Sequence, residues 1–280
     1  MATYQQTSEL LHPIVPTAPV AHFCLAVFSL WWREMIRFYR QWARVIGVIA
    51  SPLLFWIVIG SGFGSSFRES HSSSESYLMY FYPGSLIMII LFTSIFTMMS
   101  VIQDRNEGFL LSVLVAPIPR SAVVLGKVLG GTTLAALQGL VFLIFLPAIG
   151  LHIGLVQLGL VAFVIFLTSF ALTALGFAIA WRLDSAQAFH AIINVFLIPL
   201  WLLSGALFPL SGAASWIRLI MRANPLTYGV DALRMALRPD ITSTSEFSMP
   251  VSIAILAAFS LVLFGSALFM ANRKSLRPAA

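Results

Sequence analysis

The chain has 280 residues, of which 59% are hydrophobic and only 9% are charged, and its mean hydropathy is +0.95. Soluble domains carry about 25% charged residues, so this composition excludes a soluble globular protein and predicts an all-α integral membrane protein. The net charge of +6 does not predict nucleic-acid binding, because Lys and Arg gather on the cytoplasmic side of membrane proteins. The single cysteine, Cys24, excludes an intrachain disulfide.

Residues 1–27 predict a flexible cytoplasmic N-terminus. Residues 1–19 contain three prolines and show no helical periodicity. The first twenty residues also lack a basic region followed by an apolar core, so we expect no cleavable signal peptide in them.

Residues 28–44 predict an amphipathic helix that lies in the membrane interface. Four arginines fall on one stripe of such a helix, and four large apolar side chains fall on the opposite side. We expect the arginines to face lipid headgroups and the apolar side chains to face acyl chains. Simple anchoring explains this pattern, and an additional contact with a cytoplasmic partner is compatible with it. The two sets are Arg33, Arg37, Arg40 and Arg44, and Trp31, Met35, Phe38 and Trp42.

Six apolar segments are long enough to cross the hydrocarbon core, which needs about 20 residues of helix. Together with the interfacial helix they form one transmembrane domain, residues 28–271, which a basic cytoplasmic tail at residues 272–280 follows. Gly130 and Gly131 in the third span allow close helix contact. The predicted spans are residues 45–63, 77–101, 123–149, 155–181, 188–209 and 251–271.

The segment between the fifth and sixth spans predicts two short helices that do not cross the membrane. Residues 213–221 are moderately apolar but too short to span. Residues 225–237 follow Asn224, a favourable N-cap, and begin with Pro225 at the first helical position. We expect this pair to be re-entrant or to lie on the surface, where protein or a water-filled cavity surrounds its backbone.

The distribution of Lys and Arg predicts that both termini are cytoplasmic. In that orientation, 11 of the 16 Lys and Arg residues fall in inner segments. Four arginines in the last outer loop weaken this bias, although Asp231, Asp240 and Glu246 partly balance them. The segment between the second and third spans is then cytoplasmic.

The sequence lacks the chemistry that several other functions need. No Asp, Glu, Lys or Arg lies in the middle of a predicted span, which argues against an ion-coupled carrier or a channel. Residues 60–65 lack the third glycine of a dinucleotide-binding loop, and residues 125–128 lack the Ser or Thr of a phosphate loop. The chain is therefore not expected to be an enzyme or to bind a cofactor. Active transport would need an ATPase on another chain.

The polar segment at residues 101–127, VIQDRNEGFLLSVLVAPIPRSAVVLGK, predicts a short helix at residues 106–115 that ends before two prolines. This segment resembles the signature of ABC-2 type permeases, the membrane subunits of ATP-binding-cassette exporters. A second segment, NPLTYGVDALR at residues 224–234, resembles the Asn-Pro-Leu-Thr-Tyr motif before the last span of that family. The first match rests on Arg105, Glu107, Gly108, residues 110–114, Pro117, Arg120, Gly126 and Lys127.

The resemblance, which covers residues 28–277, implies a mechanism. The helix at residues 106–115 would be a coupling helix on the nucleotide-binding subunit, and the short outer helices would form an external gate. Substrate would pass between two permeases along the second and fifth spans. The implied coupling residues are Asp104, Arg105, Glu107, Gly108, Leu110, Leu114 and Arg120; those of the gate are Asn224, Pro225, Tyr228 and Arg234; those of the substrate path are Phe92, Phe96, Phe196 and Trp201.

The resemblance also implies an assembly and a location. The partner ATPase would bind ATP and Mg²⁺, and two permeases, as a homodimer or a heterodimer, would join two ATPases in the inner membrane of a prokaryote. The substrate would be lipophilic or amphipathic: a drug, a lipid or a lipid-linked glycan. An ion-coupled secondary carrier and a non-transporting membrane assembly protein are the alternatives. Phe109 and Leu111 stand where many relatives have Thr and Glu, which leaves the ionic contacts of the coupling helix open.

Overall fold

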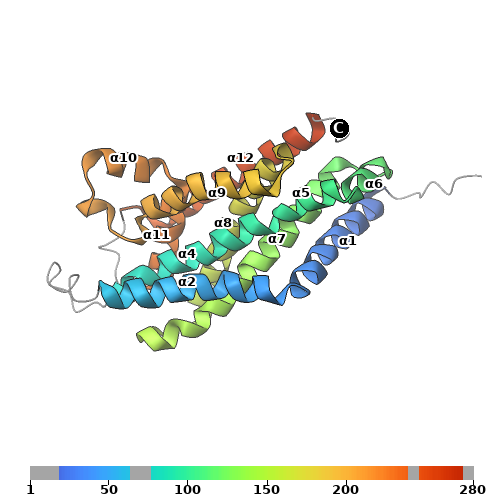
Figure 1. Cartoon of the computed structure of the whole chain (residues 1–280). Helices are drawn as coiled ribbons and strands as arrows, with labels where there is room; N and C mark the ends of the chain where they lie inside the picture. The colour runs from blue at the N-terminus through green and yellow to red at the C-terminus, as the bar shows by residue number, and fades with distance from the viewer. Residues whose placement is uncertain (1–18, 64–76, 239–245, 274–280) are drawn as a thin grey trace, which may run out of the picture.

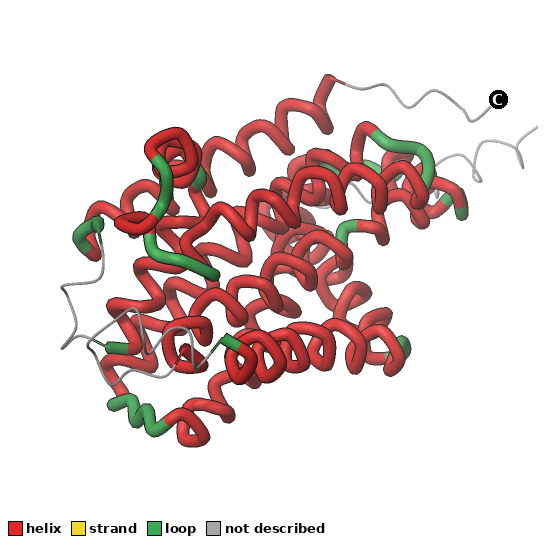
Figure 2. Tube along the Cα trace, turned by 60° about the vertical axis from the view of Figure 1, so that its left-hand side comes forward, coloured by secondary structure: helices red, strands yellow, loops and turns green. Residues whose placement is uncertain are grey.

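Long helices run side by side along one axis of the molecule (Figure 1). The computed structural model describes residues 19–63, 77–238 and 246–273, and these ranges contain helices and loops but no strand (Figure 2). Helix α6 lies at one end of the long axis, and α10 and α11 lie toward the other (Figure 1). We call these the α6 end and the α10 end. The helices are α1 (Pro19–Tyr39), α2 (Trp42–Gly62), α4 (Tyr77–Thr97), α5 (Met99–Asn106), α6 (Phe109–Val115), α7 (Arg120–Phe142), η2 (Leu143–Ile149), α8 (Leu155–Arg182), α9 (Ala186–Trp201), η3 (Leu202–Ala206), η4 (Leu210–Gly212), α10 (Ser215–Ala223), α11 (Pro225–Leu237) and α12 (Met249–Arg273).

Five helical segments of the described chain are long and apolar enough to cross a membrane. They correspond to the last five of the six predicted spans. The remaining predicted span, residues 45–63, coincides with α2, in which the apolar stretch Ala50–Gly62 is shorter. The five segments are Tyr77–Asn106, Arg120–Ile149, Leu155–Arg182, Ala186–Ala206 and Met249–Arg273.

Some boundaries differ from the predicted ones. Helix α1 begins at Pro19, so the last part of the predicted flexible N-terminus is helical, while residues 1–18 lie outside the described residues. The predicted coupling helix begins at Phe109 instead of residue 106, because Gly108 has a φ of 76° and ends the preceding helix. Helix α12 continues to Arg273, and the rest of the predicted tail lies outside the described residues.

Helix α4 forms the centre of the bundle and contacts α2, α7 and α8. Its sequence is apolar on every side, which suits a helix that neighbours enclose, and Phe81, Ile87 and Ile90 are fully buried. Gly131 of α7 permits this packing. A Cβ atom at Gly131 would lie 2.6 Å from Cγ2 of Thr173, so any larger residue would push α7 away from α8.

Helix α1 packs closely on α7 because two glycines of α7 lie four residues apart. A Cβ atom at Gly126 would lie 2.9 Å from Cβ of Leu30, and one at Gly130 would lie 2.9 Å from Cβ of Glu34. Small residues at this spacing let two helix backbones approach in a membrane. The close contacts predicted at Gly130 and Gly131 are confirmed.

The face of α1 that was expected to meet acyl chains packs against protein instead. Met35 and Phe38 are buried against Leu134 of α7, and Nε1 of Trp31 donates a hydrogen bond to Oγ1 of Thr133 at 3.0 Å. A different apolar stripe of α1 is exposed, and the predicted side chains of Trp42 and Arg44 lie outside the described residues. Both stripes are apolar, so the position of α7 decides which of them is covered. The exposed stripe consists of Phe28, Trp32, Ile36 and Tyr39.

Candidate functional site

A cluster of charged side chains joins α1, α5 and α7 at the α6 end. Asp104 of α5 is fully buried, and it accepts hydrogen bonds from Arg33 at 2.7 and 2.8 Å and from Arg37 at 2.8 Å. Nζ of Lys127, on α7, contacts the second carboxylate oxygen of Asp104 and lies 2.5 Å from Oε1 of Glu34. We call these five residues the charge cluster.

The charge cluster can exist inside the protein because every charge in it has an opposite partner. Glu34, Asp104 and Lys127 are each at most 3% exposed, and a buried charge without a partner would cost several kcal/mol. The hydrogen bonds with Asp104 raise the pKa of the Arg33 guanidinium above its usual value. Arg33 and Arg37 were expected to face headgroups, but they point at this internal carboxylate.

Two more arginines join the same end of the molecule to the last turns of other helices. Arg105 donates to the carbonyls of Trp181 and Leu183 at the end of α8 and pairs with Asp184 at 2.8 Å. Arg120 donates to the carbonyls of Ala271 and Asn272 at the end of α12. Guanidinium groups suit these positions because the last carbonyls of a helix lack partners and carry partial negative charge.

The charge cluster and the contacts of Arg105 and Arg120 form a frame around α6. Helix α6 is the exposed element within this frame. Leu110 is buried beneath it and Leu114 is half-buried, whereas Leu111 is 47% exposed and Val115 is 86% exposed. The guanidinium of Arg33 stacks over the ring of Phe109 at 3.6 Å, so the start of α6 contacts the charge cluster. A small apolar surface is therefore displayed on a rigidly supported helix.

The predicted coupling residues differ in whether they are buried within the chain or exposed at its surface. Asp104 and the guanidinium of Arg105 are engaged inside the chain, and Arg120 caps α12. Glu107 remains on the surface, where its side chain is 61% exposed and lies 3.6 Å from Arg37. Gly108 provides the break between α5 and α6. Of the two predicted acidic contacts, Asp104 is therefore buried and Glu107 is exposed.

The residues of the second motif build the α10 end. Asn224 caps α11 by accepting a hydrogen bond from the N–H of Leu226, and its amide donates to the carbonyls of Leu200 and Leu203. It therefore satisfies backbone groups that the π-helical turn η3 leaves free after α9. Pro225 occupies the first turn of α11, and the Tyr228 hydroxyl donates to the Arg222 carbonyl of α10. The predicted helix at residues 225–237 and its cap are confirmed.

A second buried ion pair lies within α11, and its arginine also links this helix to η3. Arg234 lies 3.4 Å from Asp231, donates to the Gly205 carbonyl at 3.2 Å and stacks over the ring of Tyr80 at 4.5 Å. One carboxylate oxygen of Asp231 is buried without a hydrogen-bond partner among the described residues. Burial raises the pKa of Asp231 to about 6, and the neighbouring Arg234 guanidinium opposes that shift.

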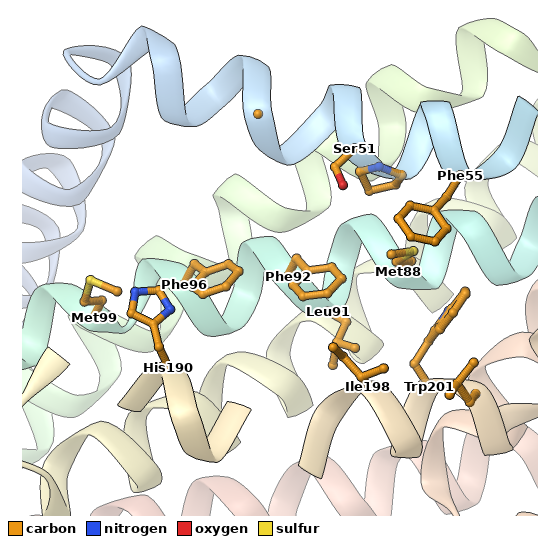
Figure 3. Close-up of a pocket in the computed structure, with 13 residues that line it drawn as sticks. Ser51, Phe55, Met88, Leu91, Phe92, Phe96, Met99, His190, Ile198 and Trp201 are labelled. Carbon is orange, nitrogen blue, oxygen red and sulfur yellow. The ribbon is translucent and has the colours of Figure 1, made fainter. Parts of the chain in front are cut away.

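A cleft of about 750 Å³ separates α2 from α9, and α4 forms its floor. Figure 3 shows Phe92 and Phe96 of α4 between Phe55 of α2 and His190 of α9. Of the residues predicted for the substrate path, Phe92, Phe96 and Trp201 line this cleft, whereas Phe196 is 67% exposed and lies outside its lining. The lining is Gly47, Ser51, Pro52, Phe55, Met88, Leu91, Phe92, Phe96, Met99, His190, Ile198, Trp201 and Leu202.

Comparison with known proteins places this arrangement in a family. The family model described as "ABC-2 type transporter" matches residues 26–237, most of the chain. The chain belongs to the ABC-2 type transporter family. It is similar to a putative transport permease, ycf38, of Cyanophora paradoxa, with 29% identity covering 86% of this chain and 87% of that protein. It is also similar to the inner membrane transport permease YadH of Escherichia coli, with 27% identity covering 76% and 82% of the two chains.

A third relative, the daunorubicin resistance ABC transporter permease protein DrrB1 of Streptomyces coeruleorubidus, is 27% identical over 72% of this chain and 71% of its own. Membership of the ABC-2 type transporter family makes this chain a membrane-embedded permease. The predicted resemblance to ABC-2 permeases is therefore confirmed.

The sequence did not predict the charge cluster of this ABC-2 permease. Glu34 and Lys127 are separated by 93 positions, and each was interpreted alone, as part of an interfacial helix or of a Gly-Lys signature. One feature of the sequence could have indicated the cluster. Glu34 is the single acidic residue among the four arginines of residues 33–44. An acid at that position, next to the packed face of α1, indicates a buried cation on a neighbouring helix.

Proposed function

We propose that this permease is the membrane subunit of an ATP-driven exporter and that α6 receives the force from a separate ATPase. The observation that carries the proposal is an exposed apolar helix, α6, held inside a frame of charge-assisted contacts. Leu111 and Val115 are exposed at its surface, and Glu107 stands beside them. A surface helix of a monomer gains nothing from displaying Val115 to water, whereas a docking partner would cover it.

The frame gives such a force a route into the bundle. Closure of an ATPase dimer would push α6, whose first residue, Phe109, stacks with Arg33 of α1. Asp104 would pass the displacement to α1 and α7, and Arg105 would pass it to α8. Arg120 would carry it to α12. ATP and Mg²⁺ would be bound by the ATPase and not by this chain.

The apolar cleft supports a lipophilic or amphipathic substrate, such as a drug, a lipid or a lipid-linked glycan. Its walls are almost entirely apolar, with Phe92, Phe96 and Trp201 among them. One copy leaves the cleft open along its side, so two permeases with two ATPases, as a homodimer, would enclose the path. The α10–α11 pair, fixed by Asn224 and Arg234, would form the external gate.

We place the protein in the inner membrane of a prokaryote with both termini in the cytoplasm. In this orientation the charge cluster and α6 are cytoplasmic, where an ATPase can reach them, and the α10 end is external. The excess of Lys and Arg in the inner segments supports this orientation.

Copurification tests the proposal. Tagged full-length chain, extracted from native membranes, should bring down an ATP-binding-cassette ATPase in a complex of two permeases and two ATPases. Val115→Asp should abolish recovery of the ATPase, and Glu107→Arg should reduce it. Leu155→Asp is the matched control. Leu155 is also highly exposed, at 87%, but it is the first residue of α8, whose other end lies at the α6 end. Unchanged recovery with both Val115→Asp and Glu107→Arg would refute the docking role of α6.

An ion-coupled carrier is the second candidate, and the buried ion pairs give it an observation of its own. Asp231 and Arg234 are buried, as charged relays in such carriers are. They lie in α11, which is not one of the five long apolar segments, and this position favours the exporter. Transport into vesicles that needs ATP and persists without an ion gradient would separate the two functions.

A further inference from the structure

A second cavity, of about 500 Å³, lies at the α6 end between α1 and the junction of α5 with α6. One of its walls is cationic and is formed by Arg33, Arg37 and Arg40. Trp32 and Ile36, on α1 like Arg33 and Arg37, form an apolar part of the lining, which we call the apolar wall. Ser29, Gln41 and Glu107 complete the lining.

The cationic wall carries one more positive charge than its surroundings neutralise. Arg33 and Arg37 share the carboxylate of Asp104, and Arg37 also lies 3.6 Å from Glu107. Lys127 and Glu34, behind this wall, pair with one another. Arg40 is exposed, and no carboxylate of the described residues pairs with it. The three arginines against Asp104 and Glu107 therefore leave a net charge of about +1 facing the cavity, and an anion is the ligand that this charge favours.

The apolar wall continues beyond the cavity along the surface of α1. Phe28, Trp32 and Ile36 follow one another at helical spacing and are 57%, 51% and 39% exposed. The rings of Phe28 and Trp32 lie parallel, with centroids 6.4 Å apart. Aromatic side chains of this kind gather where the headgroup region of a membrane meets the acyl chains. A ligand that used both walls would need an anionic head and a long apolar tail.

We propose that this cavity binds an anionic phospholipid of the membrane leaflet at the α6 end. Its phosphate would accept hydrogen bonds from Arg40 and Arg37, and one acyl chain would lie along Phe28, Trp32 and Ile36. Free phosphate would use the cationic wall alone, so the paired walls favour a lipid. Because Arg37 also holds Asp104 and Glu107, the bound lipid would connect the bilayer to the support of α6. The site requires only that the chain lies in a membrane.

Lipid retention by the full-length protein tests the site. The protein is purified in detergent and titrated with phosphatidylglycerol or phosphatidylcholine, and native mass spectrometry measures the bound lipid. Arg40→Gln removes the proposed phosphate contact. Arg182→Gln is the matched control, because Arg182 is also exposed and also lies at the α6 end, in the last turn of α8. Trp32→Ala shortens the apolar wall at an exposed position.

Arg40→Gln should weaken phosphatidylglycerol binding by about fivefold, the effect expected of one arginine near a lipid surface, and should remove the preference over phosphatidylcholine. Arg182→Gln should change the binding by less than about twofold. Trp32→Ala should weaken both lipids and keep the preference. Equal losses in Arg40→Gln and Arg182→Gln would overturn the site, because they would show general surface charge. Competition by millimolar inorganic phosphate that displaces the lipid completely would also overturn it in favour of a free-phosphate site.

Discussion

Substitution of Lys127 should strongly lower the stability of the protein, because its ammonium group lies between two buried carboxylates. Asp104 has two further partners in Arg33 and Arg37, whereas among the described residues Glu34 has only Lys127 within 3 Å and Arg33 at 4.0 Å. Glu34 therefore depends on Lys127 for charge neutralisation more than Asp104 does. Loss of Lys127 would leave Glu34 as a nearly unpaired charge in a low-dielectric environment.

Lys127→Met should destabilise the protein by about 3–5 kcal/mol, the cost of removing one partner of a buried ion pair. Thermal unfolding in detergent measures the effect. The double variant Glu34→Gln with Lys127→Met should recover much of the loss, since Asp104 keeps Arg33 and Arg37. A double variant that is as unstable as the sum of the single variants would contradict this account of the cluster.

Asp231 gives the α10 end a dependence on pH. Its folded-state pKa of about 6 exceeds the ordinary value of 3.8, so folding favours the protonated carboxyl. That stabilisation is fully present below pH 3.8 and is lost as the pH rises through about 6. In the part of the chain that the structure describes, Arg234, Glu246 and Tyr80 are the titratable groups that interact with it.

Asp231→Asn should therefore raise the thermal unfolding temperature at pH 7 and change it little at pH 4, because Asn cannot ionise. The difference between variant and native protein should grow between pH 5 and pH 7. Asp184→Asn, at a side chain that is 84% exposed, is the control and should show no such growth. A constant difference for Asp231→Asn across this range would mean that the carboxyl does not titrate there.

The sequence predicted single residues well where their role is local. Asn224 and Pro225 were expected to start a helix, and they do so because N-cap geometry depends only on neighbouring backbone. Asp104 was expected at a docking surface and is buried, because its three cationic partners come from α1 and α7. Pairing between distant segments leaves no periodic trace in a sequence.

At the scale of elements, helix contacts depend on where small residues lie. Gly131 faces α8 and α4 so closely that an added methyl group would overlap Thr173. Gly159, on α8, has no atom within 4 Å of the position of an added Cβ. The two positions therefore separate the packing role of a glycine from its intrinsic effect on helix stability.

Gly131→Ala should destabilise the protein by about 1–3 kcal/mol through overpacking. Gly159→Ala should be neutral or stabilising by up to about 1 kcal/mol, because Ala is the better helix former. Thermal unfolding of the two variants, compared with the native chain, measures the contrast. Equal effects at the two positions would show that the contact between α7 and α8 tolerates an extra methyl group.

Helix α1 shows what an element's sequence leaves undecided. Its periodicity predicted an amphipathic helix, and the helix is present. The helix carries two apolar stripes, however, and only one of them packs against α7. The stripe with Met35 and Phe38 is covered because Gly126 and Gly130 allow α7 to approach that side. Which stripe meets lipid depends on the partner helix and not on the composition of α1.

At the scale of the whole molecule, the long apolar helices were predictable because hydrophobic length alone identifies a membrane span. The relation between the two ends was not predictable in this way. The α6 end is joined to α1, α8 and α12 by Asp104, Arg105 and Arg120. The α10 end is joined to η3 by Asn224 and Arg234. Between them, α4 and α9 border the cleft, which therefore lies between the two ends.

Cysteine cross-linking tests the central claim that α6 meets the ATPase. Cys24, the chain's single cysteine, is exposed and is replaced by Ser, and a new cysteine is placed at Val115 or at Leu155. These positions are 86% and 87% exposed at opposite ends of the bundle. In native membranes treated with a short bifunctional reagent, the Val115→Cys protein should cross-link to an ATP-binding-cassette ATPase and the Leu155→Cys protein should not. Cross-linking from Leu155→Cys alone, or from neither position, would contradict the account.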